Sequence, residues 1–225
     1  MGMWYQEAHD RPQSRDDIQK LLNHLLAYTL MNQEDEKEIV ALVRAARKNA
    51  RGYADYFGWA IDRDFEEVGI IQSLAESLDT KGQLFFSSIL GRGRGNDPPD
   101  CEAETVNGER IAIEVTELVD GEAIKAFKNG SIYDWAVWTQ ESFIEGLERA
   151  IESKDSRFTK LKGTPYPGGY FLVIHTDEPT LNYTIVERYL NYKFKKPKYI
   201  SRAFLVLGYD PSTKSCPFFE LELNG

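Results

Sequence analysis

The sequence lacks the features that mark membrane proteins and disulfide-rich secreted proteins. Its 225 residues contain no apolar run that approaches the roughly 20 residues of a membrane span, and the N-terminus has no basic-then-apolar signal pattern. Only two cysteines occur, Cys101 and Cys216. Their spacing fits neither a metal site nor a disulfide framework, although a single bridge between them is an alternative to two free thiols. We therefore expect a reduced, cytoplasmic protein with no membrane partner.

Positive charge is also scarce. Asp and Glu number 36 against 27 Lys and Arg, which gives a formal net charge of −9. This balance argues against a protein that coats nucleic acid through bulk electrostatic attraction. It does not exclude a nuclease, because the carboxylates of a metal site add negative charge and basic residues can cluster elsewhere. The three histidines, His9, His24 and His175, have no spacing that suggests a metal site.

The hydrophobic pattern predicts an α/β domain that follows a helical extension. Amphipathic helices are expected over 15–31 and 34–52, so residues 1–60 form an N-terminal helical extension and residues 61–225 form the main domain. In that domain we expect a mixed central sheet flanked by helices. The predicted elements are a helix at 64–79, strands at 84–90, 101–105 and 109–118, a helix at 134–153, a strand at 170–176, a helix at 182–194, and strands at 203–208 and 218–223.

The turn at Asn107-Gly108 allows two registers for the hairpin around it. A two-residue turn would place Cys101 opposite Glu114 and would point Asp100 to the other face of the sheet. A three-residue loop with Gly108 in the left-handed region instead places Asp100 directly opposite Glu114. The second register also produces a continuous apolar face, so we favour it. That face comprises Cys101, Ala103, Ile111, Ile113 and Val115.

Pro99-Asp100, followed after thirteen residues by Glu114-Val115-Thr116, resembles the motif of the PD-(D/E)XK nuclease superfamily. The resemblance covers about residues 64–176 and includes the order of elements. It implies a restriction-endonuclease-like αβββαβ core and a divalent-metal-dependent nuclease, with Mg²⁺ or Mn²⁺ as cofactor and DNA as the expected substrate. The alternative is a catalytically inactive member of the same fold that binds a protein or a nucleic acid.

Phosphodiester hydrolysis requires charge to be stabilised on the attacking and departing oxygens, which hard cations held by carboxylates can do. The resemblance implies that Asp100, Glu114 and the backbone carbonyl of Val115 are metal ligands. It also implies a supplementary glutamate on the preceding helix. Glu67 fits that position because it shares the stripe of Ile71 and faces the sheet. The alternative is a glutamate at the edge of this stripe with its carboxylate in solvent.

The sequence departs from the family at Thr116, which stands where the motif lysine is usual and cannot supply a positive charge. Some members of the superfamily take the missing group from the following helix. Gln140 is the candidate on that helix, and Lys154 and Lys160 are the nearest later lysines. Helical rise places Gln140 and Lys154 about 20 Å apart, so they cannot both reach one metal. We predict Gln140 and leave the lysine unassigned.

Three further residues near the motif have two interpretations each. Glu102 shares a face with Asp100 in the favoured register, so it is either another ligand or a strand residue that faces solvent. Arg92 and Arg94 lie in the loop Gly91-Arg92-Gly93-Arg94-Gly95 and could bring guanidinium groups to the phosphates of DNA. The other interpretation of this loop is a flexible connection with incidental arginines.

Overall fold

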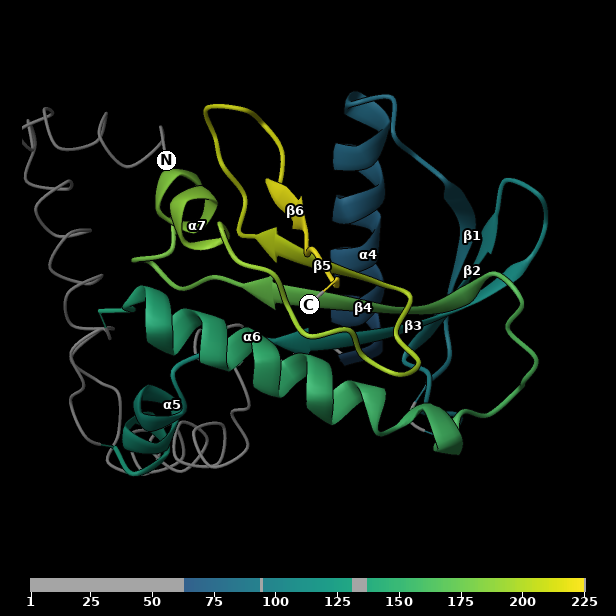
Figure 1. Cartoon of the computed structure of the whole chain (residues 1–225), viewed down its shortest axis with the longest axis horizontal. Helices are drawn as coiled ribbons and strands as arrows, with labels where there is room; N and C mark the ends of the chain where they lie inside the picture. Colours follow the sequence, from purple (N-terminus) through teal and green to yellow (C-terminus); the bar gives the residue numbers. More distant parts are fainter. Residues whose placement is uncertain (1–62, 94, 131–136, 225) are drawn as a thin grey trace, which may run out of the picture. The chain divides into compact units, whose positions relative to one another are not determined.

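A six-stranded mixed sheet lies at the centre of the domain, with its strands in the order β1-β2-β3-β4-β5-β6 (Figure 1). The computed structural model describes residues 63–93, 95–130 and 137–224. The helices expected over 15–31 and 34–52, and the domain boundary at residue 60, lie outside these residues. None of the described helices is long and apolar enough to cross a bilayer.

The described elements confirm an α/β domain in which helices flank a mixed sheet. The helices are α4 (Arg63–Thr80), α5 (Gly121–Lys128), α6 (Gln140–Asp155) and α7 (Tyr183–Tyr189), with a 3-10 turn at Phe158–Lys160. The strands are β1 (Phe86–Gly91), β2 (Cys101–Thr105), β3 (Arg110–Glu117), β4 (Gly169–Thr176), β5 (Arg202–Leu207) and β6 (Phe218–Glu220).

Three helical features differ from the sequence prediction. The short helix α5 was not predicted. Helix α6 begins at Gln140 rather than at residue 134, because Thr139 and Ser142 form a capping box. Helix α7 ends at Tyr189 rather than at residue 194, because the chain turns inward. Phe194 is buried there, and its N–H donates to the carbonyl of Glu222 at 2.9 Å.

The hairpin of β2 and β3 adopts the favoured register, and that prediction is confirmed. Cys101 pairs with Ile113 and Glu104 pairs with Arg110. Gly108 has a φ of 80°, and the N–H of Thr105 donates to the carbonyl of Glu109 at 2.8 Å across the three-residue loop. One step beyond the Cys101–Ile113 pair, this register brings Asp100 opposite Glu114.

The two faces of the sheet pack against different helices (Figure 1). Helix α4 places Ile71, Leu74 and Leu78 on the face that carries Ile113 and Phe204. Helix α6 covers the opposite face, which carries Glu114. Strands β3, β4 and β5 are parallel and buried on both faces, which explains their nearly continuous apolar sequences. The apolar residues of α6 that cover this face are Phe143, Ile144, Leu147 and Ile151.

Candidate metal centre

Asp100 and Glu114 are held together by the start of the β2–β3 hairpin. Both residues are buried, and Asp100 Oδ2 accepts a hydrogen bond from the backbone N–H of Val115 at 2.7 Å. The hairpin register, continued past β2, places Pro99 opposite Val115. Because proline has no N–H, it cannot donate to the Val115 carbonyl as an ordinary strand residue would. The motif proline therefore interrupts the ladder at the point where the two carboxylates meet.

Asp97 is a third carboxylate at this place, and sequence reasoning missed it. One oxygen of Asp97, one of Asp100 and one of Glu114 all lie within 4.8 Å of one another. The loop that carries Asp97 is held from a distant segment, since the N–H of Lys162 donates to the carbonyl of Pro98 at 2.8 Å. The available signal was an acidic residue three positions before Asp100. Its approach to Glu114 depends on contacts that the local sequence does not show.

Two cations neutralise the carboxylate cluster, which comprises Asp97, Asp100 and Glu114. Lys154 Nζ lies 2.5 Å from Glu114 Oε2 and 3.1 Å from Asp100 Oδ2. Arg157 reaches the same oxygen of Glu114 at 3.1 Å through Nη1, and its Nη2 contacts Asp97. The described site thus pairs three acidic groups with two basic ones, leaving one formal negative charge when all five residues are ionised.

Burial and the neighbouring charges act differently on the two central carboxylates. Burial raises the pKa of Glu114 to about 7, a shift that Lys154 opposes and Asp100 reinforces. Burial would also raise the pKa of Asp100, but Lys154, the Val115 N–H and Arg157 together hold that pKa below its usual value. Two carboxylates in contact with the same lysine therefore differ in proton affinity, and Glu114 is the one that titrates near neutrality.

We expect the metal-free protein to lose stability as the pH rises from about 4.5 to about 7. The folded-state pKa of Glu114, about 7, lies above the ordinary value of 4.5, so the folded protein retains a proton that the unfolded chain releases. The resulting stabilisation is complete below the lower pKa and is lost as the pH passes through the higher one. Glu114→Gln cannot titrate and should lack this dependence. Urea unfolding of both proteins in EDTA between about pH 5 and pH 8 measures the difference. If the difference in the free energy of unfolding between the two proteins did not change with pH, Glu114 would not be the group with the raised pKa.

Gln140 does not reach the carboxylate cluster, so the predicted substitute for the motif lysine is wrong. Gln140 is the first residue of α6, and its amide nitrogen donates to the carbonyl of Tyr189 at 3.2 Å. Lys154 belongs to the last turn of the same helix, about 21 Å farther along its axis. The sequence did contain a signal for Lys154, because this lysine continues the buried stripe of Phe143, Leu147 and Ile151.

Glu67 faces the sheet as predicted, but the structure does not bring it into the carboxylate cluster. It is buried on α4, which covers the face opposite to α6. Its alternative interpretation, with the carboxylate in solvent, is wrong, and a supplementary role in the site stays a prediction. Thr116 lies two residues after Glu114 on β3, points to the same face and is half-buried. It carries no charge that could replace Lys154.

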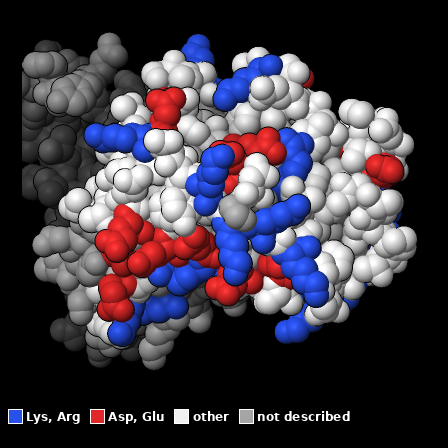
Figure 2. Space-filling model, viewed as in Figure 1, with Lys and Arg blue, Asp and Glu red and all other residues white. Residues whose placement is uncertain are grey.

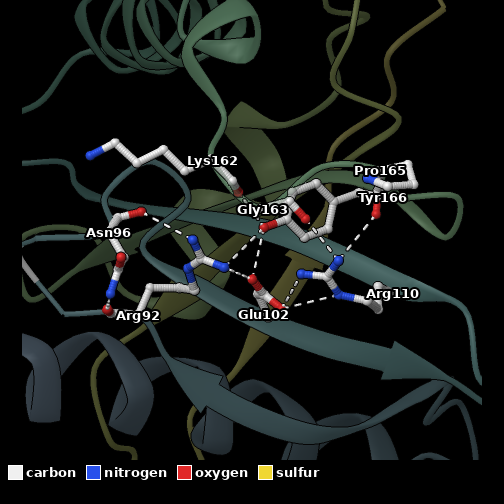
Figure 3. A network of polar contacts seen from close by, with 8 residues as sticks. All are labelled: Arg92, Asn96, Glu102, Arg110, Lys162, Gly163, Pro165 and Tyr166. Carbon is white, nitrogen blue, oxygen red and sulfur yellow. Dashed lines mark hydrogen bonds and ion pairs between the residues drawn. The ribbon is translucent and has the colours of Figure 1, made fainter.

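Glu102 is committed to ion pairs rather than to the carboxylate cluster (Figure 3). One of its oxygens contacts Arg92 and accepts from the Tyr166 hydroxyl at 2.8 Å, and the other lies 2.7 Å from Arg110 Nη2. Burial alone would raise the pKa of Glu102, but these donors hold that pKa below its usual value. Glu102 is therefore poorly placed to be a further ligand.

The same network restrains the glycine-arginine loop. The side chain of Arg92 contacts Glu102 and the carbonyl of Asn96, so it ties the loop to β2 (Figure 3). Its guanidinium is thus engaged within the protein, and a contact between Arg92 and phosphate stays a prediction. Arg94 lies outside the described residues, and its predicted phosphate contact stays a prediction. The interpretation of the loop as a merely flexible connection does not fit its first half.

Comparison with family models, curated proteins and solved structures finds no match for this chain. The carboxylate cluster and the motif that it contains are therefore the features of this chain that bear on its function.

Proposed function

We propose that this protein is a divergent member of the PD-(D/E)XK superfamily and acts as a Mg²⁺- or Mn²⁺-dependent nuclease on DNA. The observation that carries the proposal is the convergence of Asp97, Asp100 and Glu114 beside the buried Lys154. The element order α4-β1-β2-β3-α6-β4 supports a restriction-endonuclease-like core, although α5 is inserted between β3 and α6.

The oxygen atoms of the cluster suit a hard divalent cation. Glu114 Oε1 is buried and has no hydrogen-bond partner among the described residues. Such an oxygen is costly to desolvate unless a cation or a donor compensates it. Because the N–H and C=O of one strand residue point to the same side, the Val115 carbonyl leaves β3 toward Asp100. Three carboxylates and a carbonyl form an all-oxygen site, which suits Mg²⁺ and Mn²⁺ better than it suits softer metals.

A metal bound there would act as a Lewis acid and lower the pKa of a coordinated water. The protein contributes the rest of the electrostatics. Lys154, buried and in contact with two carboxylates, is our candidate for the positive charge that the motif lysine of the family supplies. The Arg157 side chain is 27% exposed, so its guanidinium can be reached by a phosphate from solvent. Asp100 is oriented by the Val115 N–H and does not need to reorganise on binding.

DNA cleavage in Mn²⁺ tests the proposal directly. We expect wild-type protein to cleave linear, circular or single-stranded DNA, and Asp100→Asn and Glu114→Gln to lose cleavage, because each removes an anionic ligand. Gln140→Ala is the matched control, since Gln140 lies on the same helix as Lys154 but far from the carboxylates. Cleavage that persists in Asp100→Asn would point to a contaminant or a different site.

Metal binding should also appear as a rise in melting temperature without any substrate. A cation that binds only the folded state stabilises it by mass action, by about 2.7 kcal/mol at a hundred times its Kd. We expect Mn²⁺ to raise the Tm of wild type, and Asp97→Asn to require more Mn²⁺ for the same rise. Glu114→Gln should show little response. Thermal unfolding with Mn²⁺ and with EDTA measures the shift, and an unchanged response in Glu114→Gln would place the metal elsewhere.

The alternative is a non-catalytic member of the same fold that binds a partner. It is favoured by the pairing of the carboxylates with Lys154 and Arg157, because a closed ion-pair network can also be a purely structural feature. Well-folded protein that neither cleaves any DNA substrate nor responds to Mn²⁺ would favour this alternative.

A further inference from the structure

Two lysine-rich segments meet at the C-terminal end of α6. The first, 156–162, contains Arg157, Lys160 and Lys162, and the second, 191–201, contains Lys193, Lys195, Lys196 and Lys198. Neither segment contains an aspartate or a glutamate. In a chain with a net charge of −9, this concentration of one sign defines a distinct local surface.

Direct contacts bring the two segments together. The rings of Phe158 and Tyr199 stack with centroids 4.2 Å apart and planes inclined by 6°. The carboxylate of Asp155 accepts hydrogen bonds from three successive backbone N–H groups, those of Lys198, Tyr199 and Ile200, at 3.0, 2.7 and 2.9 Å. Asp155 is the residue after Lys154, so the second segment is anchored to the last turn of α6, whose Lys154 contacts the carboxylate cluster.

The lysines on these segments are available to a ligand. Lys160, Lys195, Lys196 and Lys198 are exposed, and no ion pair to a carboxylate involves them within the described part of the chain. Lys193 differs, because it pairs with Glu222 at 3.2 Å. Lys162 is exposed, and its Nζ donates to the carbonyl of Gly95 at 3.2 Å, in the loop that also carries Asp97. The exposed ammonium groups thus extend to the loop that carries Asp97.

Glutamates predominate on the remaining outer face of α6, although the exposed Arg149 pairs with Glu145 there at 3.6 Å. Figure 2 shows acidic side chains gathered over the first half of this helix and basic side chains toward its C-terminal end. Four glutamates of α6 are spaced three or four residues apart and therefore lie on one face of the helix, where they form an acidic stripe. A polyanion that approaches the site would be repelled by this stripe and attracted by the lysines beyond it. The residues of the stripe are Glu141, Glu145, Glu148 and Glu152.

We propose that Lys160, Lys162, Lys195, Lys196 and Lys198, here called the lysine surface, bind the phosphate backbone of a nucleic acid and guide it to the carboxylate cluster. The proposal rests on the proposed nuclease function, which requires a polyanion to approach three carboxylates. The lysine surface provides the local attraction that the net charge of the chain does not. It also explains how an acidic protein could bind DNA in one orientation, with the acidic stripe of α6 turned away from it.

Fluorescence anisotropy with labelled DNA in EDTA tests this surface separately from catalysis. The test variant is Lys195→Gln/Lys196→Gln/Lys198→Gln, whose side chains are exposed and whose fold can be checked by thermal unfolding. The matched control, Lys125→Gln/Lys128→Gln/Arg149→Gln, makes the same change in net charge at exposed positions of α5 and α6. Both are compared with wild type on a short duplex and on a single strand, between about 50 and 200 mM salt.

We expect the test variant to bind at least about tenfold more weakly and to lose about 2–3 from the slope of log K against log salt, because each phosphate contact contributes about 0.9 on duplex DNA. The control should bind as wild type does. The proposal would be overturned if wild type did not bind DNA, if both variants were weakened equally, or if neither was weakened. It would also be overturned if polyglutamate competed for the protein as effectively as unlabelled DNA does. Lysine-dependent binding without cleavage in Mn²⁺ would instead overturn the nuclease function and retain the surface.

Discussion

Replacing Lys154 with methionine should destabilise the metal-free protein by about 3–5 kcal/mol, the usual cost of removing one partner from a buried ion pair. The side chains of Asp100 and Glu114 are 1% and 0% exposed, so water cannot replace the lost ammonium group. Methionine keeps an unbranched apolar chain that is only one atom shorter than lysine, which limits the effect of a cavity. Urea unfolding in EDTA gives the difference in the free energy of unfolding.

Two comparisons separate charge from packing in that experiment. Lys125→Met removes an exposed lysine of α5 whose ion pair with Glu122 is a surface contact, so we expect a change within about 0.5 kcal/mol. Glu114→Gln combined with Lys154→Met removes one of the carboxylates that Lys154 had neutralised. The double variant should be more stable than Lys154→Met alone, because the two residues are in direct contact and their effects are not additive. A loss below about 1 kcal/mol in Lys154→Met would show that the ammonium group is not needed to hold these carboxylates in the core.

The register of the hairpin could be predicted because a slip by one residue has a large cost. A slip of β2 would move Cys101 and Ala103 out of the core and place Glu102 and Glu104 in it, since β3 is held by its pairing with β4. The same alternation showed that Asp100 and Glu114 share a face. Strand pattern and turn chemistry, both local properties, were therefore sufficient for the centre of the site.

The partners of these carboxylates could not be predicted in the same way. Asp97 depends on a loop that is held by Lys162, and Glu102 depends on Tyr166, which is 64 positions away in the sequence. Neither pairing follows from local propensity or periodicity. Lys154 could have been predicted, because its helical spacing from Phe143, Leu147 and Ile151 places it on the buried stripe of α6. We instead chose Gln140, at the start of that helix, as the substitute for the motif lysine. Helical rise then excluded Lys154, because the two residues are too far apart to reach one metal.

Lys154 is the candidate for the cation that the motif lacks. If the proposed function holds and Lys154 supplies the charge that the motif lysine provides in the PD-(D/E)XK superfamily, Lys154→Met should lower the rate of Mn²⁺-dependent cleavage about 10²–10³-fold, the usual effect of losing one preorganised electrostatic group. Thr116→Lys in the wild-type background should be neutral or harmful. Lys154 and Arg157 already contact Glu114, and a third cation on the same face would repel both.

Combining the two substitutions makes the test specific. Thr116 and Glu114 point to the same face of β3, so a lysine at position 116 can bring its ammonium group toward the cluster from the strand instead of from α6. Thr116→Lys in the Lys154→Met background should therefore recover part of the lost cleavage, whereas Thr116→Met in that background should not. Single-turnover cleavage rates at saturating Mn²⁺ separate this effect from metal affinity. Wild-type rates in Lys154→Met would show that the lysine only balances charge in the core. Folded Lys154→Met that has lost cleavage and regains it with Thr116→Lys would show that the reaction requires a cation that can be supplied from either element.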